Sequence, residues 1–108
     1  MNLTSSDITK IARLMLHQRG VYCWRQNQIP VKGRRFVGEP GQSDLIGFNK
    51  YTGQFVACEV KAKGDALSDS QRDFLKMVKA AKGIAVIACE RLGRVQMVDI
   101  EDYLNDKF

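Results

Sequence analysis

Apolar side chains recur every three or four positions near the start of the chain, which predicts an amphipathic helix. Ser5 or Ser6 can cap the start of this helix, and Gly20 can end it. The opposite stripe of the same segment is basic. The apolar stripe consists of Ile8, Ile11, Ala12 and Met15.

A short strand and a long loop follow this helix. Residues 21–24 are rich in strand-forming side chains. Trp24, in this strand, can stack on a base but belongs more often to a core. Residues 27–43 are rich in glycine, proline and basic side chains and predict a loop with a short strand at 35–37. A loop of this length in a small domain is more often functional than idle.

The centre of the chain predicts a β-hairpin. Residues 44–48 and 54–61 have the composition of strands, and residues 49–53 between them have that of a turn. Symmetric folding about Tyr51 and Thr52 sets the register of the two strands. This register decides which polar side chains share a face.

The C-terminal part of the chain begins with a second helix. Ser68 and Gln71 form a capping-box pattern that opens a helix running to about Lys82, and Gly83 ends it. Residues 84–89 are a continuous apolar run, which is typical of a strand buried on both faces. The whole chain of 108 residues is expected to form one α/β domain over residues 1–108.

A further strand over residues 95–98 follows a turn at Gly93, and Asp99 caps a short final helix. The predicted order is helix, strand, loop, hairpin, helix, two strands and short helix. No internal repeat or linker interrupts this order.

The basic residues are concentrated in the first third of the chain. Seventeen Lys and Arg against twelve Asp and Glu give a net charge of +5. Residues 1–37 hold seven basic side chains and one acid, whereas residues 38–75 hold four basic and six acidic side chains. A basic surface beside a carboxylate cluster would suit a protein that binds a polyanion such as nucleic acid. A solvated basic helix next to an acidic loop would give the same pattern.

Composition excludes several classes of protein. No apolar run approaches the ~20 residues that a membrane span needs, and the N-terminus does not read as a signal peptide. Three cysteines and one histidine fit no zinc-ligand pattern. We therefore expect a cytoplasmic protein without a membrane partner or a small-molecule cofactor.

Three charged side chains converge at the open end of the predicted hairpin. The register places Asp44 opposite Glu59, and strand alternation places Lys61 on the same face. Facing carboxylates repel unless a proton or a cation lies between them. Mg²⁺ usually takes one or two carboxylates, and a lysine beside it can orient water or offset charge on a phosphate. The three residues predict a hydrolytic metal site.

Longer motifs surround these residues. They are GQSDLIG at residues 41–47, EVK at residues 59–61 and L-S-x-x-Q-x-x-F-L at residues 67–75. Together they resemble the virus-type replication-repair nuclease (VRR-NUC) family, a branch of the restriction-endonuclease-like PD-(D/E)xK superfamily. The resemblance covers nearly the whole chain and implies an α-β-β-β-α-β core, in which helices flank a mixed central sheet.

The resemblance also implies hydrolysis of DNA phosphodiester bonds with Mg²⁺ or Mn²⁺. Asp44, Glu59 and the backbone carbonyl of Val60 would hold the metal, and Lys61 would be the catalytic lysine. Gln71 would face the site as a catalytic residue, although its place in the capping box gives it a competing structural role.

The chain departs from the family pattern at two positions. Ser43 stands where proline often precedes the motif aspartate, which affects the stiffness of the loop. The family also places a glutamate on the first helix, where this chain has only Asp7. Asp7 either reaches the metal or serves only the charge of the helix N-terminus.

Stand-alone domains of this family resemble Holliday-junction-cleaving enzymes, so we expect a homodimer that cuts branched DNA in a bacterial or virus-infected cell. The alternatives are a non-catalytic nucleic-acid-binding module and a nonspecific DNA nickase. The residues expected to contact DNA are Lys10, Arg13, Arg25, Lys32, Arg34, Arg35 and Lys63.

Overall fold

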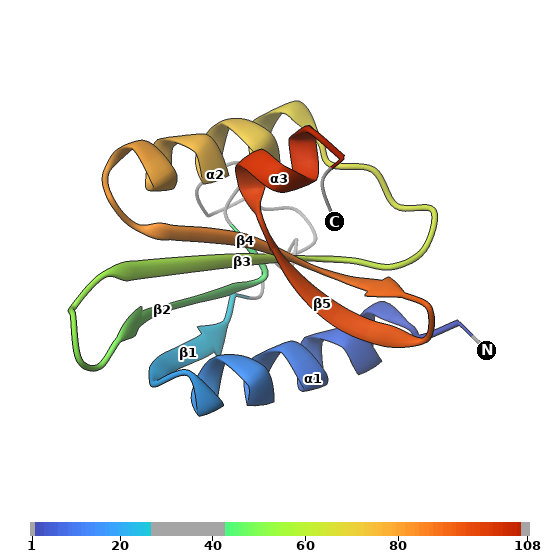
Figure 1. Cartoon of the computed structure of the whole chain (residues 1–108), viewed down its shortest axis with the longest axis horizontal. Helices are drawn as coiled ribbons and strands as arrows, with labels where there is room; N and C mark the ends of the chain where they lie inside the picture. The colour runs from blue at the N-terminus through green and yellow to red at the C-terminus, as the bar shows by residue number, and fades with distance from the viewer. Residues whose placement is uncertain (1, 27–42, 107–108) are drawn as a thin grey trace, which may run out of the picture.

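A five-stranded mixed sheet lies between helices in the computed structural model, which describes residues 2–26 and 43–106 (Figure 1). Helix α1 covers one face of the sheet, and helices α2 and α3 cover part of the other. The described strands lie in chain order, and among them only β3 and β4 run parallel. The elements are α1 (Ser5–Gln18), β1 (Val21–Arg25), β2 (Leu45–Asn49), β3 (Phe55–Lys61), α2 (Asp69–Ala80), β4 (Ile84–Arg91), β5 (Arg94–Asp99) and α3 (Ile100–Leu104).

The predicted fold class and order of elements are confirmed. The hairpin of β2 and β3 has the expected register, because Leu45 pairs with Cys58 and Phe48 with Phe55. Helix α2 makes the crossover that the parallel pair β3–β4 requires. The short strand predicted at residues 35–37 lies outside the described residues.

The start of α1 differs from the prediction. Thr4, rather than Ser5 or Ser6, caps the helix. The Thr4 Oγ1 atom accepts from the backbone N–H of Asp7, and the Asp7 carboxylate accepts from the backbone N–H of Thr4. Only Thr4 has an acidic side chain three residues later, so only Thr4 can complete this reciprocal capping box.

The end of α2 also differs from the prediction. The helix ends at Ala80, and Lys82 rather than Gly83 takes a left-handed backbone conformation, with φ of 71°. Gly83 is needed for space, because an added Cβ would lie 2.8 Å from Val78 Cγ1 and 2.9 Å from the Phe55 carbonyl oxygen. Its close approach lets β4 begin beside β3.

Strand β3 is buried on both faces. Val56, Cys58 and Val60 pack with the apolar side of α1, while Ala57 packs under α2. Glu59 lies on the α2 face of the same strand and is only 2% exposed. An ionisable group at such a depth requires partners, and these partners define the site.

Candidate active site

Asp44 and Glu59 meet at the end of the β2–β3 hairpin. Asp44 directly precedes β2, and its Oδ2 atom accepts a 2.8 Å hydrogen bond from the backbone N–H of Val60. The backbone of Asp44 is held by the neighbouring strand, because its carbonyl accepts from the N–H of Gln26 at 2.8 Å. Asp44 is close enough to Glu59 to raise the pKa of the Glu59 carboxyl group. The hairpin register therefore sets their spacing.

Burial is the largest of the effects that together raise the pKa of Glu59 to about 9. The nearby Asp44 carboxyl group adds to this effect, and the charge of Lys61 partly opposes it. At neutral pH the Glu59 carboxyl group of the protein alone therefore holds a proton. A cation between the carboxyl groups would replace that proton.

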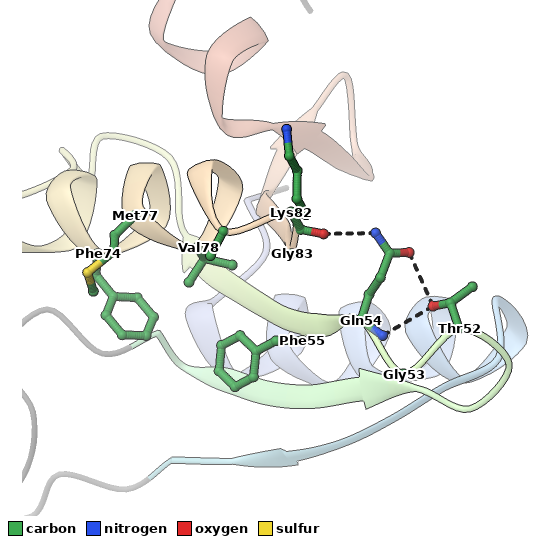
Figure 2. A pocket seen from close by; sticks show the side chains of 10 residues that line it. Thr52, Gly53, Gln54, Phe55, Phe74, Met77, Val78, Lys82 and Gly83 are labelled. Carbon is green, nitrogen blue, oxygen red and sulfur yellow. Dashed lines mark hydrogen bonds between the residues drawn. The ribbon is translucent and has the colours of Figure 1, made fainter.

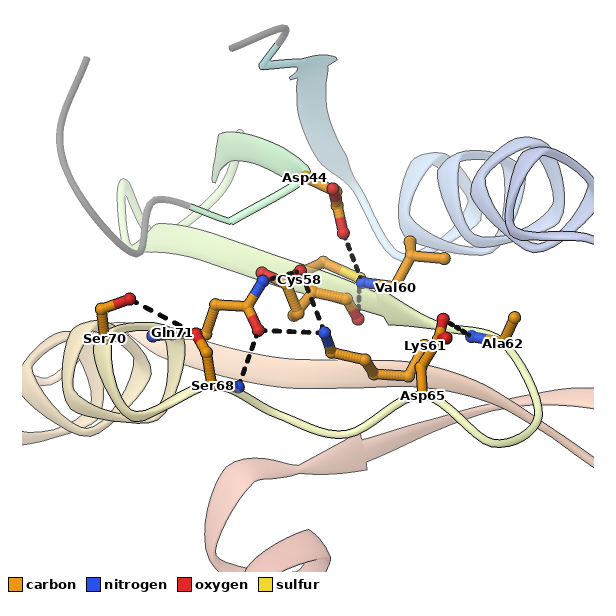
Figure 3. Close-up of polar contacts among 10 residues, drawn as sticks. Asp44, Cys58, Val60, Lys61, Ala62, Asp65, Ser68, Ser70 and Gln71 are labelled. Atoms are coloured by element: carbon orange, nitrogen blue, oxygen red, sulfur yellow. Dashed lines mark hydrogen bonds and ion pairs between the residues drawn. The ribbon is translucent and has the colours of Figure 1, made fainter. Parts of the chain in front are cut away.

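Gln71 connects the charged groups of β3 to the start of α2 (Figure 3). Its Oε1 atom accepts from Lys61 Nζ at 2.9 Å, and its Nε2 atom donates to Glu59 Oε1 at 3.0 Å. Lys61 Nζ also lies 3.9 Å from Glu59 Oε1. The amide thus fixes both side chains in one arrangement.

The structural role predicted for Gln71 coexists with its place in the site. The same Oε1 atom accepts from the backbone N–H of Ser68 at 3.0 Å, which completes the capping box of α2. The Ser68 Oγ atom accepts in turn from the Gln71 backbone N–H at 3.2 Å. The helix start therefore orients the amide toward β3.

The donor set of this site suits a hard divalent cation. Within the described part of the chain, Glu59 Oε2 is buried without a hydrogen-bond partner, which leaves one carboxylate oxygen free to bind a ligand. Mg²⁺ prefers carboxylate oxygens and usually takes only one or two of them. Among residues 2–26 and 43–106, no cluster of three or more His, Cys, Asp and Glu side chains is placed to hold a metal. Asp44 and Glu59 are the side-chain ligands that the geometry offers.

Ser43 is the second buried polar side chain of this region. It precedes Asp44, is fully buried, and its Oγ atom has no hydrogen-bond partner among residues 2–26 and 43–106.

The structure does not bring Asp7 to the site. Its carboxylate is exposed and takes part in the capping box at the start of α1. Hydrogen bonds from the backbone and then the side chain of Thr4 lower the pKa of Asp7. Of the two interpretations of Asp7, the geometry favours the one in which it serves the helix N-terminus.

The residues expected to contact DNA lie outside the carboxylate cluster. Lys10 and Arg13 are exposed on α1 and line a groove beside β1, together with His17, which was not among the predicted DNA contacts. The signal was the helical spacing of these three residues. Arg25 and Lys63 are exposed near the ends of β1 and β3, and Lys32, Arg34 and Arg35 lie outside the described residues.

Trp24 is half-exposed rather than part of the core. Strand alternation points Val21 and Cys23 toward α1 and therefore points Tyr22 and Trp24 toward the other face. No described helix packs on that face over β1, because α2 covers β3 and β4 instead. The alternation was visible in the sequence, but the position of α2 over the sheet was not.

A fold of this kind with paired carboxylates and a lysine on its central hairpin defines a class of restriction-endonuclease-like nucleases. The VRR-NUC domain matches residues 33–91, which is more than half of the chain. The chain belongs to the VRR-NUC domain family, and through it to the nucleases.

A solved structure shares this fold. It is Hjc of Archaeoglobus fulgidus, a Holliday junction resolvase from an archaeal hyperthermophile, with a TM-score of 0.60 and 15% sequence identity. The similarity covers 89% of this chain and 77% of Hjc. A search of curated proteins found no match. None of the described helices has the length and apolar character to span a membrane.

Proposed function

We propose that this chain is a divalent-metal-dependent DNA endonuclease that acts as a homodimer on branched DNA such as Holliday junctions. One observation carries the proposal: in a chain of the VRR-NUC family, Gln71 links Lys61 to Glu59, and the backbone N–H of Val60, between these two residues on β3, holds the Asp44 carboxylate. The structural likeness to Hjc, itself a Holliday junction resolvase, supports the choice of branched DNA.

Asp44 and Glu59 would hold Mg²⁺ or Mn²⁺, with the backbone carbonyl of Val60 as a further ligand. When bound, the ion would polarise the scissile phosphate and lower the pKa of a water molecule. Gln71 holds Lys61 and Glu59 in place, and Lys61 orients the attacking water and offsets charge on the phosphate. The water oxygen bonds to phosphorus while the bond to the leaving sugar oxygen breaks.

The basic side chains would position the DNA backbone. Lys10 and Arg13 form a cationic groove on α1, and Arg25 and Lys63 add charge near the ends of their strands. Contacts of this kind read phosphate positions rather than base sequence, so they suit recognition of DNA shape. The basic residues 32, 34 and 35 would extend the same contact.

Cleavage of a labelled four-way junction and of a linear duplex tests the proposal, in Mg²⁺, in Mn²⁺ and in EDTA. Asp44→Ala and Lys61→Ala should each abolish metal-dependent cutting, with a loss of about 100-fold or more. Lys50→Ala, in the exposed turn between β2 and β3, is the control and should cut like the wild type.

Two results would contradict parts of the proposal. Binding without cutting in either metal would favour the non-catalytic module, in which the 3.9 Å Lys61–Glu59 contact is only an ion pair. Equal cutting of the duplex and the junction would favour the nonspecific nickase.

A further inference from the structure

An apolar surface lies on the same sheet face as Glu59. Tyr22 and Trp24 on β1, Phe48 on β2 and Phe55 on β3 all point to this face, because Tyr22 pairs with Phe48 and Phe48 with Phe55. The ring centroid of Tyr22 lies 6.2 Å from that of Trp24 and 5.7 Å from that of Phe48, so these rings form a row. Tyr22 is 59% exposed and Met77, on the neighbouring α2, is 61% exposed.

The row continues into a cavity between the hairpin and α2. The cavity has a volume of about 550 Å³, and Figure 2 shows Phe55 and Phe74 pointing into the same space. Lys82 is the only charged side chain among the described residues that line it. We define the aromatic face as Tyr22, Trp24, Phe48, Phe55, Phe74 and Met77.

We propose that the aromatic face is the surface through which a second copy of this chain docks. The inference rests on the homodimer of the proposed function and adds the residues that build it. A two-fold contact brings one patch against itself, so charges on the patch would meet like charges. The six residues of the aromatic face carry no charge, so the face is complementary to itself, whereas a DNA backbone requires cations.

The shape and size of the aromatic face fit this occupant. Helix α2 packs on β3 and β4, and no described helix covers β1 and β2 on this face. In a two-fold dimer, α2 of one copy can therefore lie over β1 and β2 of the other. Half-exposed aromatic side chains offer roughly 100 Å² each, or roughly 500 Å² for the whole face. A stable interface buries about 800 Å² per partner, of which these side chains supply more than half.

The mass of the full chain in solution tests the proposal, without DNA or metal. We expect light scattering to give twice the 12.2 kDa of a single chain. Met77→Glu should raise the dimer dissociation constant by about 100-fold or more, because the new charge would be buried in the contact. Leu14→Glu is the matched control, since Leu14 is 64% exposed on α1 and receives the same charge.

Tyr22→Glu, on a different element, should act like Met77→Glu, and circular dichroism verifies that each variant is folded. A wild-type monomer would overturn the inference, while cleavage by that monomer would leave the nuclease proposal standing. Dimers in both variants would overturn the aromatic face alone. If both variants remain dimers but bind DNA more weakly, the aromatic face contacts DNA bases and not a second copy of the chain.

Discussion

The Nε2 atom of Gln71 donates a 3.0 Å hydrogen bond to Oε1 of Glu59, so the start of α2 determines how the carboxyl group of β3 is oriented. The Oε1 atom of the same amide accepts from Lys61 Nζ. One side chain therefore serves two groups of opposite charge, and it can do so only because an amide has both a donor and an acceptor.

Replacing Gln71 with glutamate should separate its two roles. Gln71→Glu keeps an oxygen that can accept from Ser68 and Lys61, but it can no longer donate to Glu59. The start of α2 should stay capped, because glutamate completes a capping box as well as glutamine does. Junction cleavage should fall by about 10- to 100-fold, as it does when a partner of a metal ligand is lost.

Gln96→Glu, on the exposed side of β5, is the control for the added charge. It should leave both stability and cleavage unchanged. Full activity of Gln71→Glu would show that Gln71 acts only through the helix start.

Asp7 should be dispensable for cleavage. Asp7→Ala removes half of the capping box of α1 and should lower the melting temperature, whereas Asp7→Asn keeps an oxygen that can accept from Thr4. Neither change should alter the Mg²⁺ concentration that gives half-maximal cleavage, because Asp7 is not in the cluster of Asp44 and Glu59. If both variants require more Mg²⁺ for half-maximal cleavage, Asp7 does contribute to the metal site.

The hairpin was predictable because its determinants are local. Composition located the turn between the strands, and the two-residue period of a strand then fixed which side chains share a face with Asp44. Glu59, opposite Asp44, follows from that register alone. The observed pairing of Leu45 with Cys58 is the predicted one.

The features that were missed depend on contacts between elements or on a choice between similar residues. Thr4, Ser5 and Ser6 are all good caps, and only the reciprocal bond with Asp7 selects Thr4. The exposure of Trp24 depends on where α2 lies across the sheet, which no local pattern encodes. The dual role of Gln71 likewise requires α2 to begin beside the end of β3.

The basic groove on α1 should contribute to DNA affinity rather than to the chemical step. Lys10→Ala and Arg13→Ala should each weaken junction binding and lower the slope of log affinity against log salt by about 1. The cleavage rate at saturating DNA should stay the same, because neither side chain belongs to the carboxylate cluster. Lys76→Ala, exposed on α2 across the sheet, is the control. If the slope of log affinity against log salt is unchanged in both groove variants, α1 does not contact the DNA.

Glu59 should make the metal-free protein less stable as pH rises. Its pKa in the folded protein is about 9, above the ordinary value of 4.5, so the folded state binds more protons than the unfolded state between these values. Below pH 4.5 both states are protonated and this group has no effect. Between pH 4.5 and 9 the free energy of unfolding should fall by up to about 1.4 kcal/mol per pH unit from this group.

Urea unfolding in EDTA at several pH values measures this dependence, and Glu59→Gln should remove it. Glutamine resembles the protonated carboxyl group and keeps an oxygen that accepts from Gln71. At pH 8 the variant should therefore be more stable than the wild type in EDTA, yet inactive. Saturating Mg²⁺ should flatten the pH dependence of the wild type alone, because a cation replaces the proton between Asp44 and Glu59. Equal pH slopes in the wild type and Glu59→Gln would mean that Glu59 is ionised in the folded protein.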